Sequence, residues 1–263
     1  MYERNKRLQT FTDYIVNFVN DIQKNQSEKM DSIAKKCAES VSRGGFIHLF
    51  GSGHSVIPTM DAYPRYGSFV GLHPIFDPRL MWHNVLGPGG VRELLWLERT
   101  ENYIEQHLQN EPINKGDVFI AFSHGGTNIA AIEAVEYAKK RGNYTVGITS
   151  LKNASAPARH SKGWKLSTSV DVVIDTGVPV EDAVVNVPGW SRPSGGSSTI
   201  VATIIVQELI TRIAIELGKI GIEVPTFVSP TVPGASVSSN DEVFFEHAKY
   251  LNAAVTKELN SRK

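Results

Sequence analysis

The feature that most constrains this chain is a unit that occurs twice: a short apolar run that leads directly into a loop of glycine, serine and histidine. Residues 46–50 precede Gly51-Ser52-Gly53-His54-Ser55, and residues 118–122 precede Ser123-His124-Gly125-Gly126-Thr127-Asn128. Two more apolar runs follow at 144–149 and 170–175. Runs of this length, bounded by turn residues, are typical of buried β-strands.

Helical patterns alternate with these strands. An alanine-rich stretch at 129–141 ends at Gly142, and apolar residues recur at helical spacing over the first forty residues and over 199–218. Alternating strands and helices predict βαβ units with right-handed crossovers, and hence a doubly wound α/β/α fold with a parallel sheet. Both glycine loops then lie at the carboxyl edge of the sheet, where such folds bind ligands.

The remaining segments predict three units along the chain. We expect an N-terminal helical segment at 1–42, a ligand-binding domain at 43–221, and at 222–263 an extended stretch with a final helix that packs on the same domain. Residues 175–196 have no clear period and predict an irregular, ordered loop.

Composition excludes several classes of protein. The 263 residues suffice for one or two domains, and 27 basic against 27 acidic residues give no net charge, which argues against nucleic-acid or membrane-surface binding. Cys37 is the only cysteine, so the chain cannot form an internal disulfide or a thiolate metal cluster. The sequence shows neither the pattern of a signal peptide nor an apolar window long enough to span a membrane, so we expect a cytoplasmic location.

The two loops carry the elements of a phosphate site. Free N–H groups and the positive end of the dipole at a helix start hold anions, glycines let the backbone approach, and hydroxyl groups add donors. A third hydroxyl cluster starts the late helix at Ser197, Ser198 and Thr199. The alternative is that these are ordinary capped turns, with Asn128 as one of the caps. Candidate ligand-binding residues are Gly51, Ser52, Gly53, Ser55, Ser123, Gly125, Gly126, Thr127, Asn128, Ser197 and Ser198.

Other phosphate and catalytic motifs do not fit. The chain contains no GxxxxGK[ST], no complete GxGxxG, no HExxH and no GxSxG. We therefore predict none of the sites that these motifs mark: a P-loop nucleotidase site, a dinucleotide-binding site, a zinc site on a helix or the nucleophile elbow of a hydrolase. We expect neither a metal nor an organic cofactor.

Four segments resemble the sugar isomerase (SIS) domain family of phosphosugar-binding proteins. They are GGFIHLFGSGHS, DVFIAFSHGGTN, TVGITS and SSTIVATIIVQELI. The family includes phosphoheptose isomerase, and MDAYPRYG also resembles part of the N-acetylmuramic acid 6-phosphate etherases. As a whole the chain looks most like a group of bacterial proteins that resemble both the phosphoheptose isomerases and these etherases. The resemblance implies a five-stranded, flavodoxin-like parallel sheet, a phosphate held by the serine and threonine loop, and a dimer or tetramer with sites near subunit interfaces.

The chain matches the residues of the family at some positions and departs from them at others. Ser123, Gly125 and Thr127 match the family's phosphate loop, whereas His54 and His124 are bulkier than usual. Arg65 occupies the position of the catalytic glutamate of phosphoheptose isomerases, and the histidine expected after Gln207-Glu208 is replaced near Ile210. The resemblance therefore supports binding better than any one reaction.

Four residues are candidates for acid–base chemistry. His54 and His124 lie inside the ligand loops, and imidazole can act as an acid or a base near neutral pH. Glu101 lies on a helical stripe with Leu94, Leu97, Ile104 and Leu108, and Glu98 lies at the edge of this stripe. The alternatives are histidines that only contact ligand and glutamates that are solvated surface charges.

The sequence thus predicts a cofactor-independent aldose–ketose isomerase that acts on a sugar phosphate. Two alternatives stay open: an etherase or lyase for an amino-sugar phosphate, and a non-catalytic sensor that binds a sugar phosphate and acts on a separate regulator. The apolar face of the N-terminal helical segment predicts a homodimer or homotetramer. Neither nucleic acid nor membrane is an expected partner.

Overall fold

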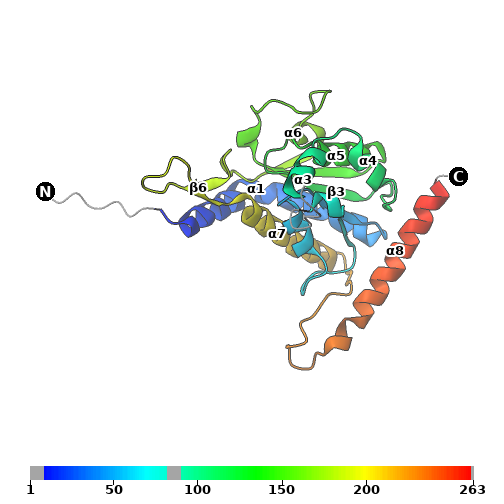
Figure 1. Cartoon of the computed structure of the whole chain (residues 1–263). Helices are drawn as coiled ribbons and strands as arrows, with labels where there is room; N and C mark the ends of the chain where they lie inside the picture. Colours follow the sequence, from blue (N-terminus) through cyan, green and yellow to red (C-terminus); the bar gives the residue numbers. More distant parts are fainter. Residues whose placement is uncertain (1–8, 82–89, 262–263) are drawn as a thin grey trace.

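A computed structural model describes residues 9–81 and 90–261. Its centre is a five-stranded sheet of β1 (Ile47–Gly51), β2 (Leu72–Ile75), β3 (Val118–Phe122), β4 (Tyr144–Thr149) and β5 (Val172–Asp175). The strand order is β2-β1-β3-β4-β5 and every pairing is parallel (Figure 1). The predicted doubly wound α/β fold is confirmed, including the five strands that the resemblance implied.

Helices cover both faces of this sheet, as Figure 1 shows. The helices α1 (Phe11–Ser42) and α7 (Ser198–Lys219) pack on one face, while α4 (Tyr103–Leu108), α5 (Ile129–Lys140) and α6 (Leu166–Ser169) pack on the other. Strand β3 follows the alternation of a pleated strand, since Val118, Ile120 and Phe122 face α1 and α7 whereas Phe119 and Ala121 face α5. Two apolar layers therefore hold the strands in place.

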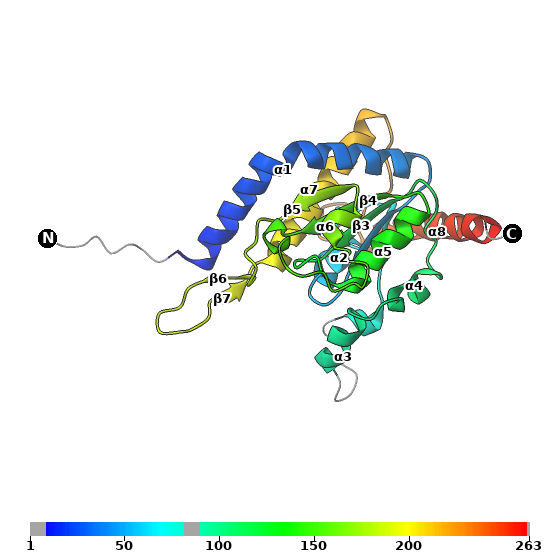
Figure 2. The same cartoon turned by 90° about the horizontal axis from the view of Figure 1, so that it is seen from above.

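The remaining elements complete the described residues. They are α2 (Val56–Ala62), α3 (Gly90–Leu97), the 3₁₀ turns η1 (Pro78–Leu80), η2 (Leu151–Asn153) and η3 (Val237–Asn240), the antiparallel pair β6 (Ala183–Val185) and β7 (Ser194–Gly196), and α8 (Asp241–Ser261). Figure 2 shows this arrangement from above. No helix of the described residues is long and apolar enough to cross a membrane.

Two local predictions were wrong. The stripe from Leu94 to Leu108 is not one helix, because α3 and α4 are separated by residues 98–102 and Asn102 adopts a left-handed φ of 65°. The segment 175–196 is not wholly irregular, because it contains the β6–β7 pair.

The last helix, α8, packs beside the amino-terminal ends of the strands. The Tyr250 hydroxyl donates to the Val41 carbonyl at 2.7 Å, and Asn114 Nδ2 donates to the Ala254 carbonyl at 3.1 Å. These contacts connect the helix to α1 and to the loop before β3. The division of the chain into units at 1–42, 43–221 and 222–263 stays a prediction.

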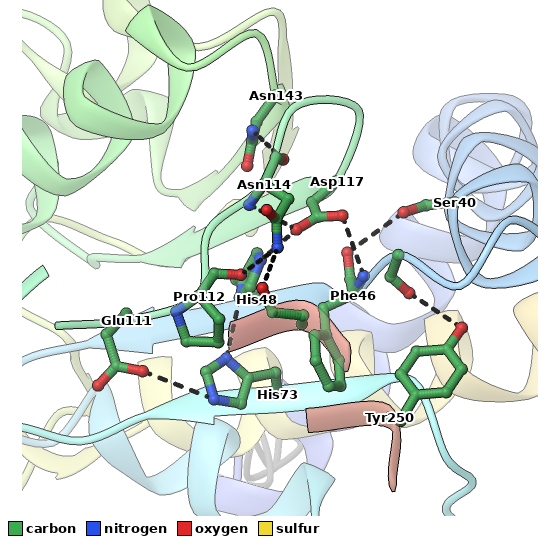
Figure 3. A network of polar contacts seen from close by, with 12 residues as sticks. Ser40, Phe46, His48, His73, Glu111, Pro112, Asn114, Asp117, Asn143 and Tyr250 are labelled. Carbon is green, nitrogen blue, oxygen red and sulfur yellow. Dashed lines mark hydrogen bonds and ion pairs between the residues drawn. The ribbon is translucent and has the colours of Figure 1, made fainter. Parts of the chain in front are cut away.

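A buried polar network fastens the amino-terminal ends of three strands (Figure 3). His48 of β1 is fully buried; its Nδ1 is 2.9 Å from His73 Nδ1 of β2, and its Nε2 is 2.9 Å from Asp117 Oδ2, just before β3. Asp117 also accepts hydrogen bonds from the backbone N–H groups of Phe46 and Asn114. His73 Nε2 lies 3.6 Å from Glu111 Oε2. This network links side chains from adjacent strands at the amino edge of the sheet.

Candidate functional site

The carboxyl edge of the sheet brings the two predicted loops side by side. Strands β1 and β3 are neighbours although β2 lies between them in sequence, so the connections leave this pair in opposite directions. Doubly wound folds bind ligands at this switch point, outside the carboxyl ends of the strands. Gly51 and Phe122 end the two strands and are paired in register.

The loop after β1 depends on its glycines. A Cβ on Gly51 would collide with the Ser55 carbonyl group, and Gly53 has a φ of 60°. Ser52 is buried, and its hydroxyl donates to Glu98 Oε2 at 2.9 Å. Ser55 is half-buried and begins α2, whereas the His54 side chain is exposed.

The loop after β3 holds two polar atoms that lack partners. Ser123 Oγ and His124 Nδ1 are buried, and neither forms a hydrogen bond within the described part of the chain. Gly126 has a φ of 61°, and a Cβ there would lie 2.8 Å from Thr149 Oγ1. Thr127 is buried and precedes α5. A buried polar atom without a partner is costly, so its presence needs an explanation.

Glu98 joins the two loops. Its carboxylate is only 4% exposed, and Oε2 accepts from Ser52 Oγ and from Asn128 Nδ2, both at 2.9 Å. Asn128 stands at the N-cap of α5 but forms no side-chain capping bond, so the predicted cap is wrong and its amide is used on Glu98 instead. Burial raises the pKa of the Glu98 carboxyl above its usual range, although the Ser52 hydrogen bond opposes this effect.

The third hydroxyl cluster lies at the start of α7. Ser197 is buried and its hydroxyl donates to the Asp182 carbonyl at 2.9 Å. Asp182 Oδ1 accepts from the backbone N–H groups of Ser197 at 2.8 Å and of Ser198 at 2.6 Å. This carboxylate therefore caps the helix.

One narrow pocket connects the three clusters. It has a cavity volume of about 10 Å³ and is lined by Ser55, Phe122, Ser123, His124, Ile148, Thr176, Ser198, Thr199 and Ala202. A single water needs roughly that much space, so a larger ligand enters only if the lining side chains move apart. Ser52, Asn128 and the Glu98 carboxylate to which they donate are outside this lining.

Glu101 lies in a different place. Both of its carboxylate oxygens accept hydrogen bonds from Ser161, which lower the pKa of the carboxyl, and it lines a separate hollow with Glu133 and His160. The structure does not bring Glu101 to the two loops. Its predicted catalytic role finds no geometric support, and that of the exposed His54 finds little.

The positions that depart from the family pattern have structural roles. Arg65 pairs with Asp61, and Gln207 Nε2 donates to Asp61 Oδ2 at 2.8 Å, which ties α2 to α7. Ile210 is buried in the core. Within the described ranges, no group of three or more His, Cys, Asp or Glu side chains is arranged to hold a metal ion.

Comparisons with known proteins agree with this architecture. The model of the SIS domain matches residues 10–150. The UPF0309 protein lin2794 of Listeria innocua is 31% identical over 229 residues, 87% of this chain and 91% of that protein. The UPF0309 protein BH0227 of Halalkalibacterium halodurans is 35% identical over 203 residues, 77% of this chain and 79% of that protein.

A solved structure shows the same fold at much lower identity. The phosphoheptose isomerase of Neisseria gonorrhoeae superimposes with a TM-score of 0.51 at 15% identity, covering 77% of this chain and 94% of that chain. The family match and the two relatives together cover most of the described sheet. The chain is thus a member of the SIS domain family and groups with the UPF0309 proteins.

Proposed function

We propose that this chain binds a sugar phosphate between the loops after β1 and β3 and converts it between its aldose and ketose forms. Membership of the SIS domain family supports sugar-phosphate binding at the family level. The observation that carries the proposal is a pair of buried atoms, Ser123 Oγ and His124 Nδ1, that have no partner among the described residues and belong to a pocket whose lining includes several serine and threonine residues. A ligand with many oxygen atoms would give these atoms their partners.

The phosphate end of the ligand belongs at the start of α5. This helix begins after a glycine pair, and the positive end of its dipole favours an anion, while the Ala130 N–H already donates to the Glu98 carbonyl at 3.0 Å. Ser123 and Thr127 add hydroxyl groups on either side of the glycines. The sugar then extends toward Ser55, Ser198 and Thr199, whose hydroxyl groups line the same pocket.

Glu98 is the proposed base for the isomerisation. The reaction moves a proton between two adjacent carbons while an acid protonates the carbonyl oxygen. A buried carboxylate with a raised pKa is a stronger base than a solvated one, and Glu98 is bonded to residues of both loops. His124 is the proposed acid in its doubly protonated form, in which Nε2–H donates to the Val180 carbonyl at 3.3 Å and Nδ1–H, which has no partner among the described residues, is left for the carbonyl oxygen of the substrate.

A sensor without catalysis is the second candidate. Two observations favour it: Arg65 stands where phosphoheptose isomerases carry a glutamate, and the buried Ile210 stands near the position of an expected histidine. Such a protein would bind the same ligand and signal to a separate regulator. The residues of the phosphate loop would keep their roles, while Glu98 would only hold the loops together.

The test is a thermal-shift screen of hexose, heptose and N-acetyl amino-sugar phosphates, each beside its unphosphorylated parent. NMR and mass analysis of the products follow for every hit. We expect stabilisation by phosphates alone and formation of an isomer of unchanged mass. Release of a small acid would indicate an etherase or lyase, stabilisation without turnover would indicate the sensor, and no stabilisation would contradict the site.

We also propose that the chain assembles with copies of itself in the cytoplasm. Several large apolar side chains are exposed, including Ile215 of α7 and Phe244 and Phe245 of α8. Exposed apolar side chains that are covered by a second copy of the chain would favour association. Mass measurement at micromolar concentration should give a multiple of the 28.9 kDa chain, and a pure monomer would contradict this proposal.

A further inference from the structure

The backbone of His124 is held by the loop that follows β4. Its carbonyl oxygen accepts hydrogen bonds from Thr149 Oγ1, from the Ser150 backbone N–H and from Asn153 Nδ2, each at 3.2 Å. All three donor residues are buried. A carbonyl oxygen has two lone pairs, so three donors occupy it fully. The loop therefore fixes the backbone at the point from which the His124 side chain leaves.

The imidazole ring of His124 is held at its far end by the segment that follows β5. Its Nε2 lies 3.3 Å from the Val180 carbonyl oxygen, which can only accept, so Nε2 carries a hydrogen atom. Nδ1 is the nitrogen that is left for the pocket, where it is buried and has no partner among the described residues. The Val180 side chain is exposed, so this contact depends only on where the backbone of the segment lies.

Ser150 connects the two contacts of His124. Its backbone N–H bonds to the His124 carbonyl, and its hydroxyl donates at 2.5 Å to the carbonyl of Val178, two residues before Val180. The hydroxyl oxygen itself accepts from the Lys152 N–H at 3.3 Å. One buried serine therefore holds both the backbone of the histidine and the segment that supplies the acceptor of its ring.

The orientation of this ring decides which nitrogen faces the pocket. The terminal torsion of a histidine side chain is broad and nearly two-fold, so a ring without a fixed partner turns easily. A turn would exchange Nδ1 for another ring edge in a pocket of about 10 Å³. A small misplacement of a reacting group is costly, because proton transfer requires a defined distance and direction.

We propose that Ser150 is a positioning residue, which acts through the backbone from Val178 to Val180 to keep the His124 ring in the orientation that points Nδ1 into the pocket. This inference rests on the proposed function, in which Nδ1–H of His124 protonates the carbonyl oxygen of the substrate. Ser150 is not part of the pocket lining. Its effect on the reaction is therefore indirect and passes through His124.

Diethyl pyrocarbonate tests the orientation on the full chain without a sugar ligand, because it acylates an imidazole nitrogen that carries no proton. In neutral His124 this nitrogen is the buried Nδ1, so peptide mass analysis should show slower modification of His124 than of the exposed His54. Ser150→Ala should raise the rate at His124, relative to His54, about fivefold, the factor that corresponds to one net hydrogen bond. Ser40→Ala is the matched control, because Ser40 is also buried and its hydroxyl also donates to a backbone carbonyl. It should leave the rate at His124 unchanged.

Turnover gives the second readout, with the sugar phosphate that the thermal-shift screen identifies as substrate. Ser150→Ala should lower kcat about tenfold and change KM by less than about twofold, because the ring is misplaced while the ligand contacts remain. Ser40→Ala should change neither value. A loss that appeared only in KM, or an unchanged kcat in Ser150→Ala, would show that Ser150 does not position the acid.

The modification result separates this inference from the function on which it rests. The inference is wrong if His124 of the wild type reacts as fast as His54, if Ser150→Ala leaves its rate unchanged, or if Ser40→Ala raises it equally. If the modification rates are as expected and no sugar phosphate is converted, the orientation stands and the proposed function fails. If Ser150→Ala does not fold, Thr149→Val makes the same comparison, because it removes a donor to the His124 carbonyl and retains the shape of the side chain. It should also raise the rate at His124, and an unchanged rate would contradict the inference.

Discussion

The two edges of the same sheet use polar residues in opposite ways. At the amino edge, His48, His73 and Asp117 are buried and bonded to one another. At the carboxyl edge, Ser123 Oγ and His124 Nδ1 are buried without hydrogen-bond partners in the described structure. The first arrangement stabilises the fold, and the second leaves hydrogen-bonding capacity for a ligand.

The hydrogen bonds at the amino edge occupy both histidines. Asp117 accepts from His48 Nε2, and one of the two Nδ1 atoms donates to the other. Burial, His48 and His247 all lower the pKa of His73. Histidines in a phosphosugar-binding protein invite a catalytic interpretation, but these two are already committed to each other. Near the amino edge, Asn143 Oδ1 and His247 Nδ1 are also buried without partners among the described residues, so such atoms indicate a ligand only where they line a pocket, as those of Ser123 and His124 do.

Removal of the central acceptor at the amino edge should have the largest effect. Asp117→Ala leaves His48 Nε2 and the N–H groups of Phe46 and Asn114 without their acceptor. We expect a loss of about 3–5 kcal/mol in the free energy of unfolding, as for a broken buried charged pair. Urea unfolding measures this loss. A change below about 1 kcal/mol would show that the network is not structural, whereas ligand affinity of the folded variant should not change.

The equivalent change at the carboxyl edge should affect turnover instead. Glu98→Gln keeps an oxygen that can accept from Ser52 and Asn128 but removes the base. We expect the isomerisation rate to fall about a hundredfold or more, with little change in ligand affinity. Glu101→Gln is the matched control and should leave the rate unchanged. A full rate in Glu98→Gln would exclude it as the base and favour the sensor.

The sequence predicts the carboxyl edge better than the amino edge. The loops at 51–55 and 123–128 follow apolar runs, so local pattern alone places them at one edge of a parallel sheet. Strand β2 was missed because His73 and Pro74 interrupt its four-residue apolar pattern. The His48–His73 contact joins residues 25 positions apart in sequence, and no local spacing encodes such a pair.

Within the candidate site, the acidic residues were the least predictable. Helical periodicity placed Glu101 on the apolar face and Glu98 only at its edge, but the chain turns between α3 and α4 and reverses that order of burial. Glu98 is buried, and Glu101 pairs with Ser161 in another hollow. The position of Asp182 before the serine cluster is visible in the sequence, but its role as the cap of α7 is not, because that role depends on a loop that folds back onto the helix.

One substitution made at both edges tests the comparison with matched chemistry. Ser123→Ala removes an unpaired hydroxyl, so it should weaken sugar-phosphate binding roughly tenfold while the free energy of unfolding stays level or rises slightly. Ser40→Ala removes a buried hydroxyl that donates to the Phe46 carbonyl at 3.3 Å. It should lower the free energy of unfolding by about 1 kcal/mol and leave affinity unchanged. Titration measures the ligand affinity of both variants, and urea unfolding measures their stability. If both variants lost affinity and stability to a similar extent, the distinction between the two edges would be wrong.

The smallest expected effect is a pH dependence of stability that arises at the amino edge. Folding lowers the pKa values of His73 and His247, so the unfolded chain binds more protons as the pH falls below their ordinary value of 6.5. The free energy of unfolding should therefore decrease from pH 7 to pH 5.5. Burial raises the pKa values of Glu111 and Glu98, which acts in the opposite direction over the acidic range and makes the net change modest. His73→Asn retains an N–H donor toward His48 but cannot titrate, so its urea unfolding should depend less on pH than that of the wild type. An equal slope in both proteins would show that the acid sensitivity arises outside His73.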